Sequence, residues 1–185
     1  MPKRCRSEDV EPLPDTTPTF RDQFETLFDE HAPRLRRYLG RLSGDPELAA
    51  DIVQELFIRL YQRGSLPDTP APWMISVAMN LFRNAATKKS RRLRLLTPAR
   101  AEEAHAGEGR SPDHALLAEE SRQRVREALA TLSDREQRLL LLREEGYSYR
   151  ELAQALGLSE ASVGTLLARA RSALKTRYEE VSDAP

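Results

Sequence analysis

The chain has 185 residues, with 29 Lys and Arg against 29 Asp and Glu, so its formal net charge is zero. This length suits one ordinary domain or two small ones. Its composition, with 31% charged, 39% hydrophobic and 6% aromatic residues, is typical of a helical globular chain. No stretch approaches the roughly 20 apolar residues that span a bilayer, so we expect no membrane insertion and a cytoplasmic location.

The sequence also argues against catalysis. The single cysteine, Cys5, excludes an intramolecular disulfide, and the three histidines are too scattered to form a metal site. No phosphate-binding glycine loop and no common nucleophile or zinc motif is present. We therefore predict a protein that is not an enzyme and has no catalytic residue, metal or cofactor. The zero net charge argues at first against a nucleic-acid partner as well, because phosphate binding favours a basic surplus.

Two helices are predicted in the first third of the chain. Residues 1–19 are rich in Pro, Thr and acid without periodicity, which indicates a flexible leader. From Phe20 apolar residues recur every three or four positions, as in an amphipathic helix, and we expect Pro33 to kink or interrupt it. Asp45 is the predicted N-cap and Pro46 the first residue of a second helix.

A third helix is predicted to begin near Trp73, after a segment rich in Gly, Ser and Pro at 64–72. Trp73, Val77 and Leu81 share one face and form its expected core stripe. Residues 81–100 contain seven Lys or Arg and no acid. Because this exceeds what a helix C-terminus needs for its dipole, we predict that the segment binds a polyanion.

The composition then divides the chain. Residues 97–114 combine Pro, Gly, Ser, Ala and Glu without periodicity, which indicates an interdomain linker. We therefore predict an all-α protein with two small helical domains, at 20–96 and 115–180, joined by a flexible linker and followed by a tail at 181–185.

The second domain carries a helix-turn-helix pattern. Ser133 and Ser148 each precede a Glu by three residues, which is the capping-box pattern of a helix start. Gly157 then marks a turn, and Ser159 is a third predicted N-cap. The last helix has a predicted core stripe at Val163, Leu167, Ala170 and Leu174. Its opposite face is small, hydroxylated and basic, which suits a DNA major groove, although an ordinary helical hairpin is the alternative.

Taken together, these motifs resemble the extracytoplasmic-function (ECF) sigma factors, the small alternative specificity subunits of bacterial RNA polymerase. The resemblance covers about residues 20–180. It rests on the segments 51–61 (DIVQELFIRLY), 73–80 (WMISVAMN), 132–138 (LSDREQR), 147–153 (YSYRELA) and 169–174 (RARSAL).

This resemblance implies a role and a set of binding residues. The chain is expected to bind core RNA polymerase, on the β′ clamp helices and the β subunit, to recognise the −10 and −35 elements of promoter DNA, and to have an anti-sigma factor as a partner. The implied polymerase-binding residues are Asp51, Gln54, Glu55 and Ile58. The implied −10 residues are Asn80, which would bind a flipped-out base, with Arg83, Asn84, Lys88, Lys89, Arg91 and Arg92. The implied −35 residues are Arg150, Ser159, Ser162, Thr165, Arg169, Arg171 and Lys175.

The sequence departs from the family pattern at Gly164 and Leu166, where cations are common, so two DNA contacts are expected to be missing.

Three alternatives stay open: a helix-turn-helix regulator of the response-regulator or quorum-sensing type, a helical adaptor that binds protein alone, and a polynucleotide-modifying enzyme. The basic run at 81–100 disfavours the adaptor, and the lack of catalytic groups disfavours the enzyme. The basic run also indicates that the zero net charge results from acidic and basic segments that cancel each other, so it is compatible with a DNA partner.

Overall fold

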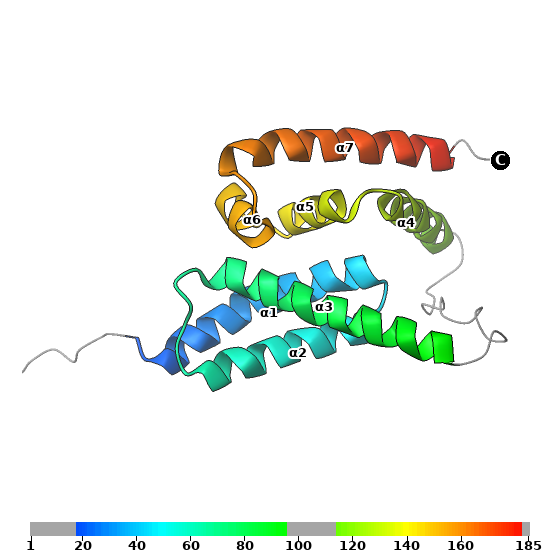
Figure 1. Cartoon of the computed structure of the whole chain (residues 1–185). Coiled ribbons are helices and arrows are strands. Elements are labelled where there is room, and N and C mark those ends of the chain that lie inside the picture. The colour runs from blue at the N-terminus through cyan, green and yellow to red at the C-terminus, as the bar shows by residue number, and fades with distance from the viewer. Residues whose placement is uncertain (1–17, 96–113, 183–185) are drawn as a thin grey trace, which may run out of the picture.

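The computed structural model describes residues 18–95 and 114–182, of which 89–95 and 114–119 are described as backbone only. Within these ranges the protein has seven helices and no strand, which confirms the all-α prediction (Figure 1). The helices are α1 (Phe20–Ser43), α2 (Pro46–Arg63), α3 (Pro70–Leu95), α4 (His114–Ala130), α5 (Asp134–Glu144), α6 (Tyr149–Leu156) and α7 (Glu160–Ser182). Most of the predicted leader, linker and tail lies outside the described residues.

The helices form two layers. In Figure 1 α1, α2 and α3 make the lower layer, and α4 to α7 make the upper one. Within the layers α1 packs on α2, and α7 packs on α4, α5 and α6. The layers also touch each other, because α3 packs on α6 and α1 packs on α5. Buried residues of both layers consequently form one continuous hydrophobic cluster.

Of the two outcomes expected at Pro33, a kink or an interruption, the interruption does not occur, because α1 runs through this residue. Proline removes the hydrogen bond that an amide at this position would give to the carbonyl of Asp29. Both residues are exposed, so this carbonyl lies on the side of the helix where water can satisfy it. At its start α1 has a capping box between Thr19 and Asp22, and these hydrogen bonds lower the pKa of the Asp22 carboxyl.

The second helix starts as predicted, and the third starts earlier. Asp45 caps α2 by accepting a hydrogen bond from the Leu48 amide at 3.0 Å. The third helix begins at Pro70 rather than near Trp73. Two prolines fit in its first turn because the amides there have no partner within the helix.

The predicted core stripe of α3 packs against the core, but it is not the most buried face of the helix. Trp73, Val77 and Leu81 are only half-buried, whereas Met74 and Ala78 on the adjacent face are fully buried. The prediction assumed that α3 has one buried face. In the structure α3 packs on α1 and α2 and also on α6, and this second contact moves the centre of the buried surface.

The helix-turn-helix is formed by α6 and α7, and the predicted signals at Ser133, Ser148 and Gly157 are confirmed. The Ser133 and Ser148 hydroxyls accept hydrogen bonds from the amides three residues on, at 3.4 and 3.3 Å. Gly157 ends α6 with a φ of +65°, the left-handed conformation that favours glycine. Ser159 directly precedes α7, but the Ser162 amide bonds the carbonyl of Ser159 rather than its hydroxyl, so the predicted side-chain cap is not made there. The core stripe of α7 is buried at its first three positions and half-buried at the fourth.

Candidate functional site

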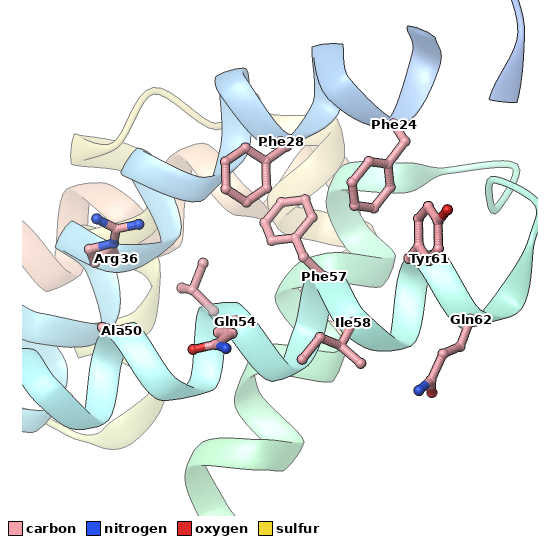
Figure 2. A pocket seen from close by; sticks show the side chains of 10 residues that line it. Phe24, Phe28, Arg36, Ala50, Gln54, Phe57, Ile58, Tyr61 and Gln62 are labelled. Atoms are coloured by element: carbon pink, nitrogen blue, oxygen red, sulfur yellow. The ribbon is translucent and has the colours of Figure 1, made fainter. Parts of the chain in front are cut away.

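An open apolar groove lies between α1 and α2 (Figure 2). It encloses about 640 Å³. The lining residues are Phe24, Phe28, Arg36, Ala50, Val53, Gln54, Phe57, Ile58, Tyr61 and Gln62. Its walls therefore come from two helices that the core already holds together, so the groove does not have to be assembled by a partner.

One wall of the groove is an aromatic cluster. The ring of Phe57 meets Phe28 at a centroid distance of 4.8 Å and Phe24 at 5.9 Å, both edge to face. Tyr61 meets Phe24 at 5.5 Å. Edge-to-face packing fixes the rings, but large apolar faces still reach solvent: Phe28 is 41% exposed and Tyr61 is 62% exposed. A connected apolar surface of this kind is typical of a protein-binding site.

The predicted polymerase-binding residues lie along the edge of this groove. Gln54 and Ile58 line it, and Ile58 is 42% exposed. Asp51 is exposed one turn earlier on α2, and Glu55 is half-buried and paired with Arg59 at 2.7 Å. The structure thus places all four on one side of α2, with two inside the groove and two beside it. Sequence reasoning missed the wall from α1, because Phe24 and Phe28 were seen only as part of the apolar face of an amphipathic helix.

The predicted −10 residues lie on a polar face of α3. Asn80, Arg83, Asn84 and Lys88 are all exposed and recur at the three- and four-residue spacings of one helix face. The Arg83 guanidinium donates a hydrogen bond to Oδ1 of Asn80. This bond orients the amide, so its NH2 group points away from Arg83 with both donors free of that bond. The side chains of Lys89, Arg91 and Arg92 lie outside the described residues.

The predicted −35 residues do not all share one surface. Ser162, Thr165 and Arg169 lie together on the side of α7 opposite its buried stripe. Arg171 and Lys175 are exposed on a flank of the same helix, and Lys175 pairs with Glu179 at 3.7 Å. The other two are Arg150, exposed on α6, and Ser159, exposed just before α7. The compact part of the surface is therefore the first half of α7.

The two unusual positions of α7 have different surroundings. Leu166 is half-buried and packs against the core, which explains an apolar residue there. Gly164 lies beside α6, where a Cβ atom would meet the Tyr149 ring at 3.5 Å, an ordinary contact distance. Of these two positions, only Gly164 therefore has room for a longer, charged side chain.

Comparison with known families decides between the open alternatives. The model of sigma-70 region 2 matches residues 27–92, and the model of sigma-70 region 4 matches residues 122–174. The ECF RNA polymerase sigma factor SigL of Mycobacterium tuberculosis is 34% identical over 161 residues, which cover 84% of this chain and 88% of SigL. The chain belongs to the ECF sigma factors of the sigma-70 family. The sigma factor CarQ of Myxococcus xanthus is 30% identical over 147 residues, covering 75% of this ECF factor and 79% of CarQ.

Solved structures agree with the fold. The sigma factor RpoE of Bartonella quintana, solved with the anti-sigma factor NepR, has a TM-score of 0.58 at 21% identity and covers 86% of this chain and 98% of RpoE. CnrH, solved with the cytosolic domain of CnrY, has a TM-score of 0.59 at 20% identity and covers 89% of this chain and 91% of CnrH. At these identities the likeness concerns the fold alone.

The ECF factor thus binds core RNA polymerase and directs transcription initiation at promoters, and its family is one of non-enzymatic transcription factors. The regulator alternative is not favoured, because sigma region 2 occupies the place where such a regulator has a receiver or ligand-binding domain. None of the described helices is both long and apolar enough to cross a bilayer.

Proposed function

We propose that this ECF sigma factor docks on core RNA polymerase through the α1–α2 groove, and that it reads the −10 element with α3 and the −35 element with α7. The observation that carries the docking proposal is the exposed groove bordered by Gln54 and Ile58. An apolar centre with a polar rim is the usual anatomy of a protein interface. Asp51 and Glu55 form an acidic rim on α2, and the β′ clamp helices are the partner that the family resemblance implies.

Run-off transcription with purified core enzyme on genomic fragments tests the proposal. The wild-type protein is expected to produce new transcription starts. Ile58→Asp puts a charge at the edge of the groove and should weaken core binding about 30-fold, the usual cost of losing a buried interface anchor of about 2 kcal/mol. Val125→Asp is the matched control, because Val125 is 38% exposed on α4, away from the groove. Equal core affinity of the two variants would place the docking surface elsewhere.

For the −10 element we propose that Asn80 pairs with the edge of an unstacked base. Its amide can donate and accept, and the bond from Arg83 holds it in one orientation. Asn80→Ala should lower open-complex formation while core affinity stays unchanged. Equal losses in both assays would contradict this role. Binding of duplex DNA by the wild-type protein without any polymerase-dependent start would instead favour the regulator alternative.

We assign the polymerase and −10 functions to a domain at 20–96 and the −35 function to a domain at 115–180. The matches to regions 2 and 4 fall inside these limits, which supports the assignment. We also expect an anti-sigma factor as partner, as in the Bartonella complex, and a cytoplasmic location, where core polymerase works. The proposed mechanism uses binding alone and requires no catalytic group, metal or cofactor.

A further inference from the structure

The turn between α5 and α6 docks on one face of α1 and joins the two halves of the molecule. The Glu145 side chain in this turn is only 2% exposed. Its carboxylate accepts a hydrogen bond from Arg37 at 2.8 Å and pairs with Arg41 at 3.2 Å. Its backbone carbonyl accepts a hydrogen bond from Nε of Arg34 at 2.7 Å. The three arginines are spaced by three and four residues, so they form one row along α1, and a buried carboxylate of one half is held by cations of the other.

Tyr147 completes this contact. It is fully buried, and its ring stacks on His31 with a centroid distance of 5.9 Å and an interplanar angle of 9°. The Arg34 guanidinium lies 4.0 Å from the centre of the same ring. Gly146 has a φ of +86°, and a Cβ atom there would lie 3.6 Å from Nη2 of Arg34. The turn therefore fits α1 closely, with an ion pair, a cation–π contact and a ring stack.

This contact fixes how far apart the two DNA-reading helices can be. Because α3 packs on α6 and α6 packs on α7, the axes of α3 and α7 lie within about 20 Å of each other at typical interhelical distances. The −10 and −35 elements are named by their positions relative to the transcription start, so they lie about 25 base pairs apart. This separation is about 85 Å at the rise of B-DNA. The described arrangement cannot bridge such a distance.

The arrangement does not cover the binding residues themselves. Asn80 on α3 and Thr165 on α7 are exposed. The groove opens between Phe28 and Ile58, on a different face of α1 from the arginine row. Docking on polymerase and contact with a single DNA element are therefore compatible with this arrangement, and only simultaneous reading of two elements is not.

We infer that the contact between the α5–α6 turn and α1 is an autoinhibitory lock, which holds the factor closed through Glu145 and the arginine row. The inference rests on the proposed function, because it assumes that α3 and α7 read separate elements. Arg37 and Arg41 have side chains 55% and 47% exposed, so water can replace their contacts with Glu145 when the halves separate. The molecule must open here before it spans a promoter.

The first experiment removes the lock by Arg37→Ala with Arg41→Ala. Loss of both partners leaves the Glu145 carboxylate buried without compensation, so the ratio of closed to open molecules should fall tenfold or more. Small-angle X-ray scattering of the full-length protein should show a larger radius of gyration. The matched control is Arg21→Ala with Arg177→Ala, which removes two arginines from exposed pairs away from the turn.

A second variant guards against a folding defect. Glu145→Gln keeps the size of the side chain and removes its charge, and it should expand the molecule in the same direction, with unchanged helix content by circular dichroism. An unchanged radius in both the double variant and Glu145→Gln overturns the lock.

The functional readout uses core polymerase and a promoter recovered by run-off transcription. The unlocked variants should form open complexes several-fold faster than the wild type, while their affinity for a duplex with a −35 element alone stays unchanged. Expansion without any gain in the rate of open-complex formation overturns the autoinhibitory role.

A covalently closed protein gives the opposite test. In a Cys5→Ser background, Arg37→Cys and Glu144→Cys are joined by a reducible bis-maleimide across the contact. The tethered protein should bind core polymerase like the wild type and form open complexes only after reduction. Initiation at the wild-type rate while tethered overturns the lock and leaves the proposed function intact. If the wild type itself neither binds core polymerase nor initiates, the proposed function fails and the lock fails with it.

Discussion

At the scale of single residues, the contact between the two halves contains polar atoms that are not fully satisfied. The Tyr147 hydroxyl is buried and finds no hydrogen-bond partner among the described residues, and the same is true of Nδ1 of His31. Burial also raises the pKa of Tyr147 well above its ordinary value. Unpaired buried groups cost free energy, so this contact is weaker than its buried area suggests.

Tyr147→Phe should therefore stabilise the protein. Removing the unpaired hydroxyl should raise the free energy of unfolding by about 1 kcal/mol, and the midpoint of thermal unfolding by about 2–4 °C for a chain of this size. Tyr38→Phe is the matched control, because the buried Tyr38 hydroxyl donates a hydrogen bond to Sδ of Met79 at 2.8 Å. Thermal denaturation of both variants compares the two hydroxyls, and an equal gain in Tyr38→Phe would contradict the explanation.

His31 makes stability depend on pH. Burial lowers the pKa of this imidazole below its ordinary value of 6.5, so between the two values the unfolded chain binds more protons than the folded one. The contribution of neutral His31 is present above pH 6.5 and is lost as the pH falls through that value and on through the lower folded pKa. Denaturant unfolding at pH 7.5 and pH 5.5 should show a larger loss for the wild type than for His31→Phe. Equal losses would mean that other groups cause the pH dependence.

At the scale of the helices, local signals were readable from the sequence and long-range contacts were not. The caps at Asp45, Ser133 and Ser148 were predicted correctly, because each depends on residues within one turn. The most buried face of α3 lies beside the predicted stripe, because α3 also packs on α6, which lies more than fifty residues away. Pro33 was expected to kink or interrupt α1. The helix continues through it, because Pro33 lies on an exposed face, and that exposure depends on how the helices pack.

The helix α7, which we propose reads the −35 element, carries a testable position at Gly164. Gly164→Lys should strengthen binding to duplex DNA a few-fold and steepen the salt dependence of the binding constant by about one unit, as for one added phosphate contact. Gly164→Ala is the matched control. It should give the same helix stabilisation of about 1 kcal/mol without changing the salt dependence. Fluorescence anisotropy at several salt concentrations measures the slope, and an unchanged slope in the Lys variant would show that this position faces away from DNA.

At the scale of the whole molecule, two domains share one core. The sequence predicted two helical domains, and the similar solved structures are consistent with a two-domain all-α fold. It could not predict that they touch, because an arginine row on a helix and a glutamate in a turn are ordinary surface features when read separately. Only the fold brings Arg37 and Glu145 together. Only one wall of the candidate groove was predicted. The α2 edge carries a family motif that the sequence shows, whereas the α1 wall has no such motif.

The shared core predicts how the protein melts. Differential scanning calorimetry of the wild type should give one cooperative transition, because the halves stabilise each other across the contact. Arg37→Ala with Arg41→Ala should split it into two transitions, one for each domain. The control Arg21→Ala with Arg177→Ala should keep one transition. A single transition in the double arginine variant would mean that the packing of α3 on α6 alone couples the halves.

The left-handed glycine in the α5–α6 turn constrains how this coupling could vary during evolution. Gly146 shapes the same turn that positions α6 against α7, the helix we propose reads the −35 element, so most changes in the turn should damage the proposed DNA contact along with closure. The arginines of α1 contribute to closure and do not position α6. Selection could therefore strengthen or weaken closure through substitutions at positions 34, 37 and 41 while promoter choice stays the same. Mutational scanning should accordingly find α1 tolerant and adjustable in this row, and the turn intolerant.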